Sequence, residues 1–255
     1  MEKEFRRGAA PARCRVAAAR GPGLASLAVQ YTGGGKVCYT PADMSTLLRV
    51  APLLFALGFQ AAPPIEPGWT SLFNGKDLTG WKVVNPASWT VKDGAIVANG
   101  TAGHVYYDGE FRNHTFRNFE LKVDVMTRSN SNGGIYVLTE YQETGFPRKG
   151  FEIQVNNSYA KDPVKTGSLY HVQDVAEAPA KDDEWFTQHI IVKGNNITVK
   201  VNDKQTVDWT QPDDWKGGRE GVGRSMGPGG GTIALQAHDP NSTVLYRNIR
   251  IKPLD

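Results

Sequence analysis

The chain has 255 residues, of which 40% are hydrophobic and 22% are charged, and its formal net charge is +3. The positive charge comes from one end, because the first 62 residues hold eight of the 29 Lys and Arg residues and three of the 26 Asp and Glu residues. The remainder has 21 basic and 23 acidic residues, a net charge of −2. Since this part lacks a basic excess, we expect no nucleic-acid partner.

The first predicted segment is an export signal. Met44 opens a short stretch with one basic residue, residues 50–59 form an apolar run, and small residues follow. This order is typical of a secretory signal peptide, and the run is too short to span a membrane, which needs roughly 20 residues. We therefore expect an untranslated or disordered leader over residues 1–43 and a signal peptide over residues 44–62. The mature domain would then be residues 63–255, exported to the periplasm or the extracellular space, with no membrane span. The alternative is a genuine disordered leader before a short buried helix.

Cysteine usage limits the chemistry of the predicted mature domain. Both cysteines, Cys14 and Cys38, precede Met44. The domain therefore has no thiol for a disulfide, a thiolate metal site or a cysteine nucleophile. It also has neither a His-Glu-x-x-His motif nor an EF-hand loop. The sequence indicates no certain cofactor, and a divalent metal ion held by His, Glu or loop oxygens is left open.

Short strand-like runs recur along the rest of the chain, separated by Gly- and Asn-rich turns such as residues 92–94. No long stretch has a 3.6-residue period. This pattern indicates an all-β sandwich and leaves its topology open. We expect Trp69, Trp81, Trp89 and Trp185 to fill its core. The predicted strands cover residues 89–91, 95–98, 119–125, 134–139, 151–156, 186–193, 196–201, 206–209, 232–237 and 245–252.

Two of these predicted strands carry a carboxamide beside a titratable side chain. Side chains alternate between the two faces of a strand, so Glu152 and Gln154 share the face opposite their apolar neighbours. In the second strand, Gln236 and His238 share the polar face in the same way. We expect the two pairs to form one polar patch on a sheet, with Tyr170 near its rim.

Glu152 and His238 are the candidate catalytic residues, because a carboxylate and an imidazole can transfer protons near neutral pH. The competing interpretations are a structural carboxylate on a solvent-facing surface and an exposed histidine. For the tyrosines among the binding candidates, the competing role is packing in the core or at the rim. The candidates for binding substrate are Gln154, Tyr170, Gln236, Tyr136, Arg148 and His104.

Three polar loops could border a binding site: residues 140–149, 157–166 and 215–231. The third is rich in glycine and contains Arg219 and Arg224. Its spacing does not fit a phosphate loop or a dinucleotide fingerprint. We interpret it as a lid or edge loop, with an ordinary solvent loop as the alternative.

Several stretches resemble, in the same order, the bacterial domain of unknown function 1080, now described as the 3-keto-disaccharide hydrolase domain. The resemblance covers about residues 68–254. It implies a single concanavalin-A-like jelly-roll β-sandwich with one concave face, and a carbohydrate-active enzyme that cleaves 3-keto-glycosides such as 3-keto-disaccharides. The matching stretches are residues 72–81, 131–136, 150–154, 167–170, 184–185 and 231–253.

The implied reaction suits one acid–base pair. A ketone at sugar C3 acidifies the C2 hydrogen, a base removes it, the C1 substituent leaves by elimination, and water adds later to give net hydrolysis. Glu152, His238 and a Tyr or Lys could divide these roles. The alternative is a non-catalytic, lectin-like carbohydrate-binding module that uses the same concave face. Nothing in the sequence indicates the oligomeric state.

Overall fold

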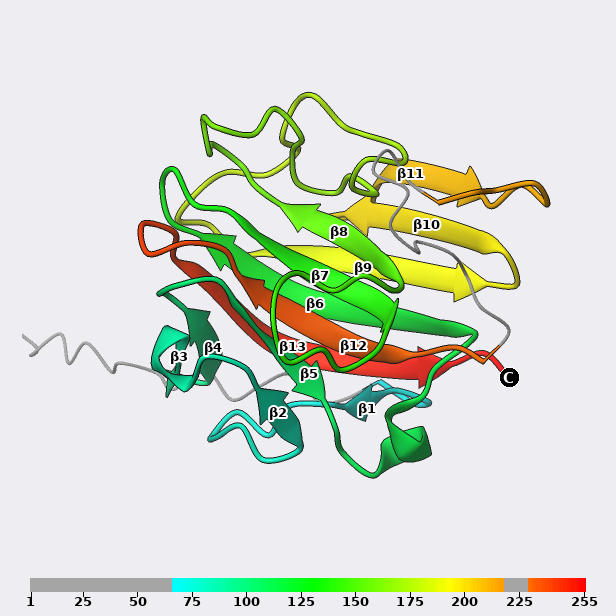
Figure 1. Cartoon of the computed structure of the whole chain (residues 1–255), viewed down its shortest axis with the longest axis horizontal. Coiled ribbons are helices and arrows are strands. Elements are labelled where there is room, and N and C mark those ends of the chain that lie inside the picture. Colours follow the sequence, from blue (N-terminus) through cyan, green and yellow to red (C-terminus); the bar gives the residue numbers. More distant parts are fainter. Residues whose placement is uncertain (1–65, 218–228) are drawn as a thin grey trace, which may run out of the picture. The chain divides into compact units, whose positions relative to one another are not determined.

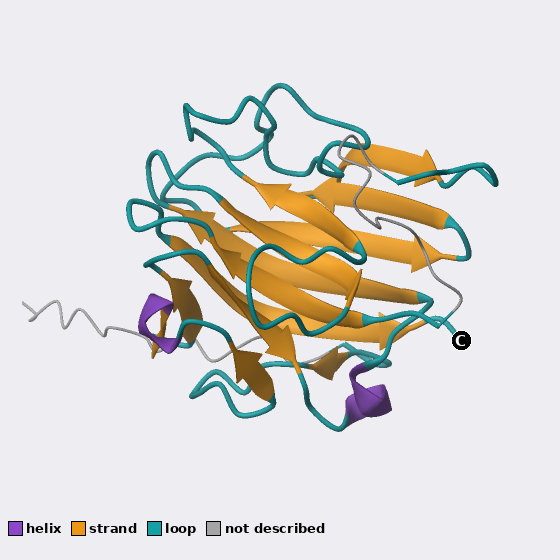
Figure 2. Ribbon diagram, in the orientation of Figure 1, coloured by secondary structure: helices purple, strands orange, loops and turns teal. Residues whose placement is uncertain are grey.

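Alternating apolar residues build two antiparallel sheets in this protein. The computed structural model describes residues 66–217 and 229–255, and every strand pairing within them is antiparallel. An eight-stranded sheet packs against a five-stranded sheet (Figures 1 and 2). The predicted all-β, concanavalin-A-like jelly-roll sandwich is confirmed. No helix in the described ranges has the length and apolar character needed to cross a membrane.

The spatial order of the strands differs from their order along the chain. The eight-stranded sheet comprises, from one edge to the other, β11 (Lys204–Thr210), β10 (Asn196–Val201), β9 (Phe186–Lys193), β6 (Phe119–Thr127), β13 (Val244–Pro253), β4 (Ala95–Ala98) and β3 (Trp89–Lys92), with β1 (Thr70–Ser71) paired to β13. The five-stranded sheet comprises β2 (Trp81–Val83), β5 (Gly103–Tyr107), β12 (Thr232–Ala237), β7 (Gly133–Thr139) and β8 (Phe151–Val155). Two short 3-10 helices are η2 (Pro86–Ser88) and η3 (Phe111–His114).

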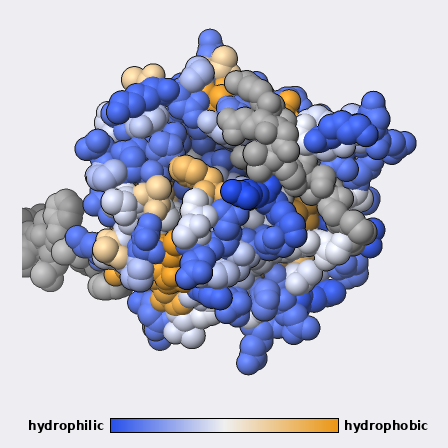
Figure 3. All heavy atoms as spheres, viewed as in Figure 1, coloured by the Kyte–Doolittle hydropathy of each residue, from blue (hydrophilic) through white to orange (hydrophobic). Residues whose placement is uncertain are grey.

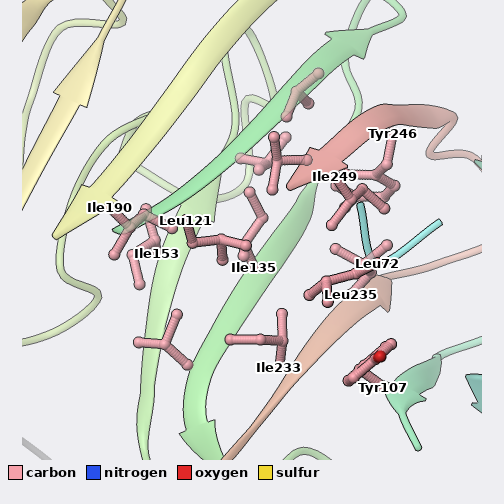
Figure 4. Close-up of a cluster of buried hydrophobic side chains, with 14 of the residues drawn as sticks. Leu72, Tyr107, Leu121, Ile135, Ile153, Ile190, Ile233, Leu235, Tyr246 and Ile249 are labelled. Atoms are coloured by element: carbon pink, nitrogen blue, oxygen red, sulfur yellow. The ribbon is translucent and has the colours of Figure 1, made fainter. Parts of the chain in front are cut away.

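The core lies between the two sheets. Ile135 and Ile153 of the smaller sheet and Leu121 and Ile190 of the larger one are fully buried in it (Figure 4). Removing each such side chain from water contributes about 1.5–3 kcal/mol. The face of the molecule drawn in Figure 3 is largely hydrophilic, with small apolar patches. Apolar side chains are thus concentrated between the sheets, as the period of two predicts.

The two sheets differ on their outer faces, and this difference creates the candidate site. In β6 and β9, buried residues alternate with half-buried or exposed ones, as expected when one face meets solvent. In β5, β7, β8 and β12, every residue is buried. The loop between β7 and β8 crosses in front of β12 and β5 (Figure 1). Polar side chains on this covered face therefore need partners within the protein.

Ten predicted strands are present, with small changes at their ends. Three further strands, β1, β2 and β5, were not predicted from the sequence. In β5, Val105 and Tyr107 face the core while His104 and Tyr106 lie on the covered face, so no contrast in polarity marks the strand. The predicted leader, signal peptide and most of the Gly-rich loop lie outside the described residues.

The prediction that four tryptophans fill the core is right for two of them and wrong for the other two. Trp81 and Trp89 are buried in it, as expected. Trp69 and Trp185 are only half-buried. The Lys122 ammonium lies 4.6 Å from the ring centre of Trp69, and the Arg247 guanidinium lies 3.8 Å from that of Trp185. The cation–π contacts show that these two indoles cover charged side chains.

We predict that Gly150→Ala destabilises the protein much more than Gly75→Ala. Both glycines have left-handed φ angles, +77° and +75°, where a side chain costs about 1–2 kcal/mol. A methyl group at Gly150 would also strike the Val137 carbonyl oxygen and come within 2.6 Å of the Leu138 carbonyl carbon, whereas in the described ranges only the chain neighbours of Gly75 lie within 4 Å of one placed there. Urea denaturation should show an added loss of about 1–3 kcal/mol for Gly150→Ala. Equal losses would show that the crowded backbone relaxes freely.

Candidate functional site

A buried carboxylate lies at the centre of the covered sheet face. Glu152 on β8 is directly opposite Tyr136 on β7, and it is only 5% exposed. The Tyr136 hydroxyl donates to Glu152 Oε2 at 2.7 Å, and Gln236 Nε2 on β12 donates to Oε1 at 2.9 Å. Gln236 Nε2 also lies 3.1 Å from the Tyr136 hydroxyl. Donors to both oxygens stabilise an ionised carboxylate in a buried position.

A glycine makes room for this carboxylate. Gly134 is on β7 opposite Gln154, and its missing side chain would point to the covered face. A methyl group there would overlap Glu152 Oε1 and lie 3.1 Å from Glu152 Cδ. Glu152 therefore leans across the strand next to its own, over the bare backbone of Gly134, to reach Gln236.

Gln154, which was predicted to share a face with Glu152, is hydrogen-bonded to the loop that follows β8. Its Nε2 donates to Asp162 Oδ2 at 3.2 Å, and the Tyr170 hydroxyl donates to the same oxygen at 3.1 Å. Asp162 Oδ1 accepts from the Val164 backbone N–H at 2.8 Å. Asp162 thus joins the sheet to Tyr170, which was predicted at the rim of the site.

His238 follows the last residue of β12 and is paired with its neighbour. Its Nδ1 lies 2.8 Å from Asp239 Oδ2. Burial raises the pKa of Asp239, but hydrogen bonds with His238, the Asn241 backbone and Ser242 outweigh this effect and lower it to about 2. With Nδ1 engaged, Nε2 is the nitrogen that can exchange a proton with a ligand. The His238 ring also contacts Tyr159, at 5.5 Å between ring centroids.

His104 on β5 lies opposite Gln236 and is 1% exposed. Its ring centroid is 5.3 Å from that of Tyr136 and 5.7 Å from that of Phe146 in the β7–β8 loop. Burial, and to a lesser extent the nearby charge of His238, lower the pKa of His104 to about 4. The imidazole is therefore neutral at pH 7. Within the described residues, its Nε2 is buried without a hydrogen-bond partner, so it is available to a ligand or a water molecule.

Two hollows adjoin this face. The His238 hollow, about 340 Å³, is lined by Asn132, Tyr159, Asp162, Tyr170 and His238, among others. The Lys82 hollow, about 520 Å³, lies toward β2 and the base of the β7–β8 loop, and its lining includes Lys82, Tyr106, Thr139, Tyr141 and Lys149. Either volume is in the range of small-molecule sites.

The predicted site residues are not all placed together. Glu152, Tyr136 and Gln236 form one hydrogen-bonded group, with His104 against Tyr136. Of the predicted site residues, Tyr170 and His238 line the His238 hollow, and none lines the Lys82 hollow. Arg148 lies apart from the others, because its side chain is exposed and its backbone N–H donates to Gln142 Oε1 at 3.3 Å.

Three neighbours of the site, Asp162, Asn132 and Lys82, were not predicted from the sequence. Asp162 lies in a loop that was expected to border the site, but no pattern singled out this carboxylate. Asn132 lies within a stretch that resembles the family and Lys82 follows one, but no motif or alternation marked either residue as part of a site. In the described part of the chain, no group of three or more His, Cys, Asp or Glu side chains is placed to hold a metal ion.

Comparison with known proteins now gives the family. Residues 68–252 match the family described as the 3-keto-alpha-glucoside-1,2-lyase-like domain, and this match covers both sheets and all the predicted site residues. The chain belongs to this family. A 3-keto-disaccharide hydrolase of Bacteroides thetaiotaomicron is 27% identical over 237 residues, which is 76% of this chain and 81% of that protein.

Solved structures also resemble this member of the 3-keto-alpha-glucoside-1,2-lyase-like family. The structure of a proposed glycosyl hydrolase of Parabacteroides distasonis has a TM-score of 0.60 at 27% identity, and the match covers 74% of this chain and 94% of that one. A second such protein from the same organism has a TM-score of 0.58 at 24% identity, covering 73% and 99%, and shows a shared fold.

We predict that Gly134→Ala displaces the Glu152 carboxylate. The new methyl group would occupy the position of Oε1, so the carboxylate must leave Gln236, Tyr136 or both. A buried donor without its acceptor costs about 1–3 kcal/mol, which should appear as lost stability in urea. A crystal structure of the variant should show the rotated side chain. Gly133→Ala is the control for the position of the carboxylate: its methyl group would lie 2.7 Å from the Tyr246 hydroxyl oxygen in the core, so stability should fall while Glu152 stays in place. A carboxylate unmoved in Gly134→Ala would contradict the prediction.

We predict that His104 makes the protein less stable in acid. Because its pKa falls from 6.5 to about 4 on folding, the unfolded chain takes up a proton first as the pH falls. The stability it contributes is present above pH 6.5 and is lost between pH 6.5 and 4, by about 3 kcal/mol in total. Unfolding free energies of the wild type and of His104→Phe should be compared at pH 7.5 and 3.5. The difference between the two proteins should shift by about that amount in favour of the variant, and a constant difference would exclude the effect.

Proposed function

We propose that this protein is an enzyme that cleaves 3-keto-glycosides. Membership of the family and the names of its hydrolase relatives support a glycoside-active enzyme in general. The geometry adds the observation that carries the finer proposal. Glu152 is a buried carboxylate on the covered face, and it is hydrogen-bonded to Gln236 of β12. The His238–Asp239 pair follows directly after the same strand.

The proposed reaction starts with loss of the proton at C2 of the keto sugar. A carbonyl at C3 stabilises the resulting carbanion as an enolate, and the electron pair then forms the C1–C2 double bond as the C1–O bond breaks. The leaving oxygen takes up a proton and departs as an alcohol. Addition of water across the double bond gives the free keto sugar, so the overall change is hydrolysis. The enzyme needs one base and one acid at neutral pH.

Glu152 is suited to be the base. In the described part of the chain, the neutral donors Tyr136 and Gln236 hydrogen-bond to its two oxygens, as suits a carboxylate that is to accept a proton. His238 is suited to be the acid, because Asp239 at 2.8 Å from Nδ1 fixes the orientation of the ring and leaves Nε2 to deliver a proton to the leaving oxygen. In this proposal the leaving group binds in the His238 hollow, where Asp162 and Tyr170 offer hydrogen bonds to its hydroxyl groups. The keto ring extends from the hollow over the covered face toward Glu152, which does not line the hollow.

We predict that Glu152→Gln lowers kcat on a 3-keto-glycoside by about 10²–10⁴-fold, the usual contribution of a general base. The fold should survive. The new carbonyl oxygen can accept from Gln236, and the new amide can donate to the Tyr136 hydroxyl, which can accept as well as donate. Glu177→Gln, at an exposed glutamate, is the matched control. Circular dichroism and denaturation verify the fold of both variants.

The substrate panel should pair each 3-keto-glycoside with its unoxidised parent, because only the ketone acidifies C2. Turnover of the keto compounds alone is expected. Wild-type rates in Glu152→Gln would leave this residue a positioning role and make His238 the leading base. Binding of glycans without turnover of any keto sugar would favour a lectin-like module over the enzyme.

A further inference from the structure

A lysine ammonium lies inside the loop that follows β8. Lys165 Nζ is 2.9 Å from the Tyr159 carbonyl oxygen, 2.9 Å from the Asp162 carbonyl oxygen and 3.3 Å from Asn156 Oδ1. An ammonium group has three N–H donors, so the three oxygens match its full donor capacity. All three come from the ten residues that end at Lys165 itself.

These oxygens are the kind that bind a free cation. Backbone carbonyls and an Asn side-chain oxygen are common ligands of Ca²⁺ in protein loops. None of the three oxygens around Lys165 belongs to a carboxylate. The nearby carboxylate of Asp162 instead accepts hydrogen bonds from Val164, Gln154 and Tyr170. The loop therefore wraps its neutral oxygens around a single positive charge that is covalently part of the chain.

The same loop forms a wall of the His238 hollow. Asn156 Nδ2 donates to the Asp162 carbonyl at 3.0 Å and to the Val164 carbonyl at 2.8 Å, so Asn156 bridges the lysine and the backbone of the wall. The carboxylate of Asp162 then holds Gln154 and Tyr170. Loss of the Lys165 ammonium would therefore free the Asp162 backbone and alter the positions of Gln154 and Tyr170, which its carboxylate holds.

We propose that Lys165 is a built-in cation, whose ammonium occupies a cation site of the 156–165 loop and thereby positions Asp162, Gln154 and Tyr170 for substrate. Lys165 does not line the hollow itself and is a positioning residue. Its effect on catalysis rests on the proposed function, whereas its effect on the loop does not.

Two substitutions separate charge from packing. Lys165→Met keeps most of the aliphatic stem and removes the charge, whereas Lys165→Ala also opens the space. In both, amide hydrogens of residues 156–166 should exchange about tenfold faster, the loss expected when charged hydrogen bonds are removed. Exchange in β9 and β10 serves as the internal reference and should not change. Lys181→Ala, at an exposed lysine in a later loop, is the matched control.

Ammonium ions provide the decisive test. In Lys165→Ala, ammonium chloride should slow exchange of the loop several-fold compared with tetramethylammonium chloride at equal ionic strength, because only ammonium has N–H donors. The wild type and Lys165→Met should respond equally to both salts, since their sites are filled. KM for the 3-keto-glycoside should rise about tenfold in Lys165→Met with little change in kcat, as expected for a binding wall that has loosened.

The outcomes distinguish this inference from the proposed function. Unchanged exchange in both variants, or faster exchange in Lys165→Ala that ammonium does not reverse, would overturn the built-in cation. A fall in kcat at constant KM would overturn its positioning role. If the wild type turns over no keto sugar, the exchange and ammonium results still decide the matter for the loop.

Discussion

The burial of the Glu152 carboxyl group is the constraint on which the site depends. A carboxylate with 5% exposure is stable there only if donors meet both oxygens. Tyr136 and Gln236 meet that need from two neighbouring strands. Their reach requires a bare backbone at Gly134. The hydrogen bonds to Glu152 therefore depend together on the strand register, on the absence of a side chain at Gly134 and on the two donors.

Much of the sandwich could be predicted because one rule governs it. Where a strand has one face in the core and one face toward solvent, as in β9 (Phe186–Lys193), the period of two is visible and the bounds are found closely. Where loops bury the second face, the rule loses contrast. That is why β5 was missed although it carries His104, and why the polar pairs of β8 and β12 stood out only through their carboxamides and titratable groups.

The site is less predictable than the sheet because it depends on contacts between distant segments. Period-two alternation indicated that Glu152 and Gln154 share a face, and the register of β7, β8 and β12 brings Gln236 to the carboxylate. No local pattern indicates that Asp162 would join Gln154 to Tyr170, since loop conformation decides that contact. Arg148 shows the converse, because a charged residue close in sequence to a site strand can face solvent.

The turn between β12 and β13 connects the imidazole to a distant strand. Ser242 Oγ donates to Asp239 Oδ2 at 3.0 Å and accepts from the Asn132 backbone N–H at 2.9 Å, just before β7. Asp239 in turn holds His238. The His238 ring is thus located relative to a strand more than a hundred positions earlier in the chain. Most surface turns tolerate insertions and deletions, but this one acts as a spacer of fixed length. An insertion between His238 and Ser242 would change the spacing of the hydrogen bonds that relate the imidazole to the sheet, whereas exposed side chains of the turn can vary without touching them.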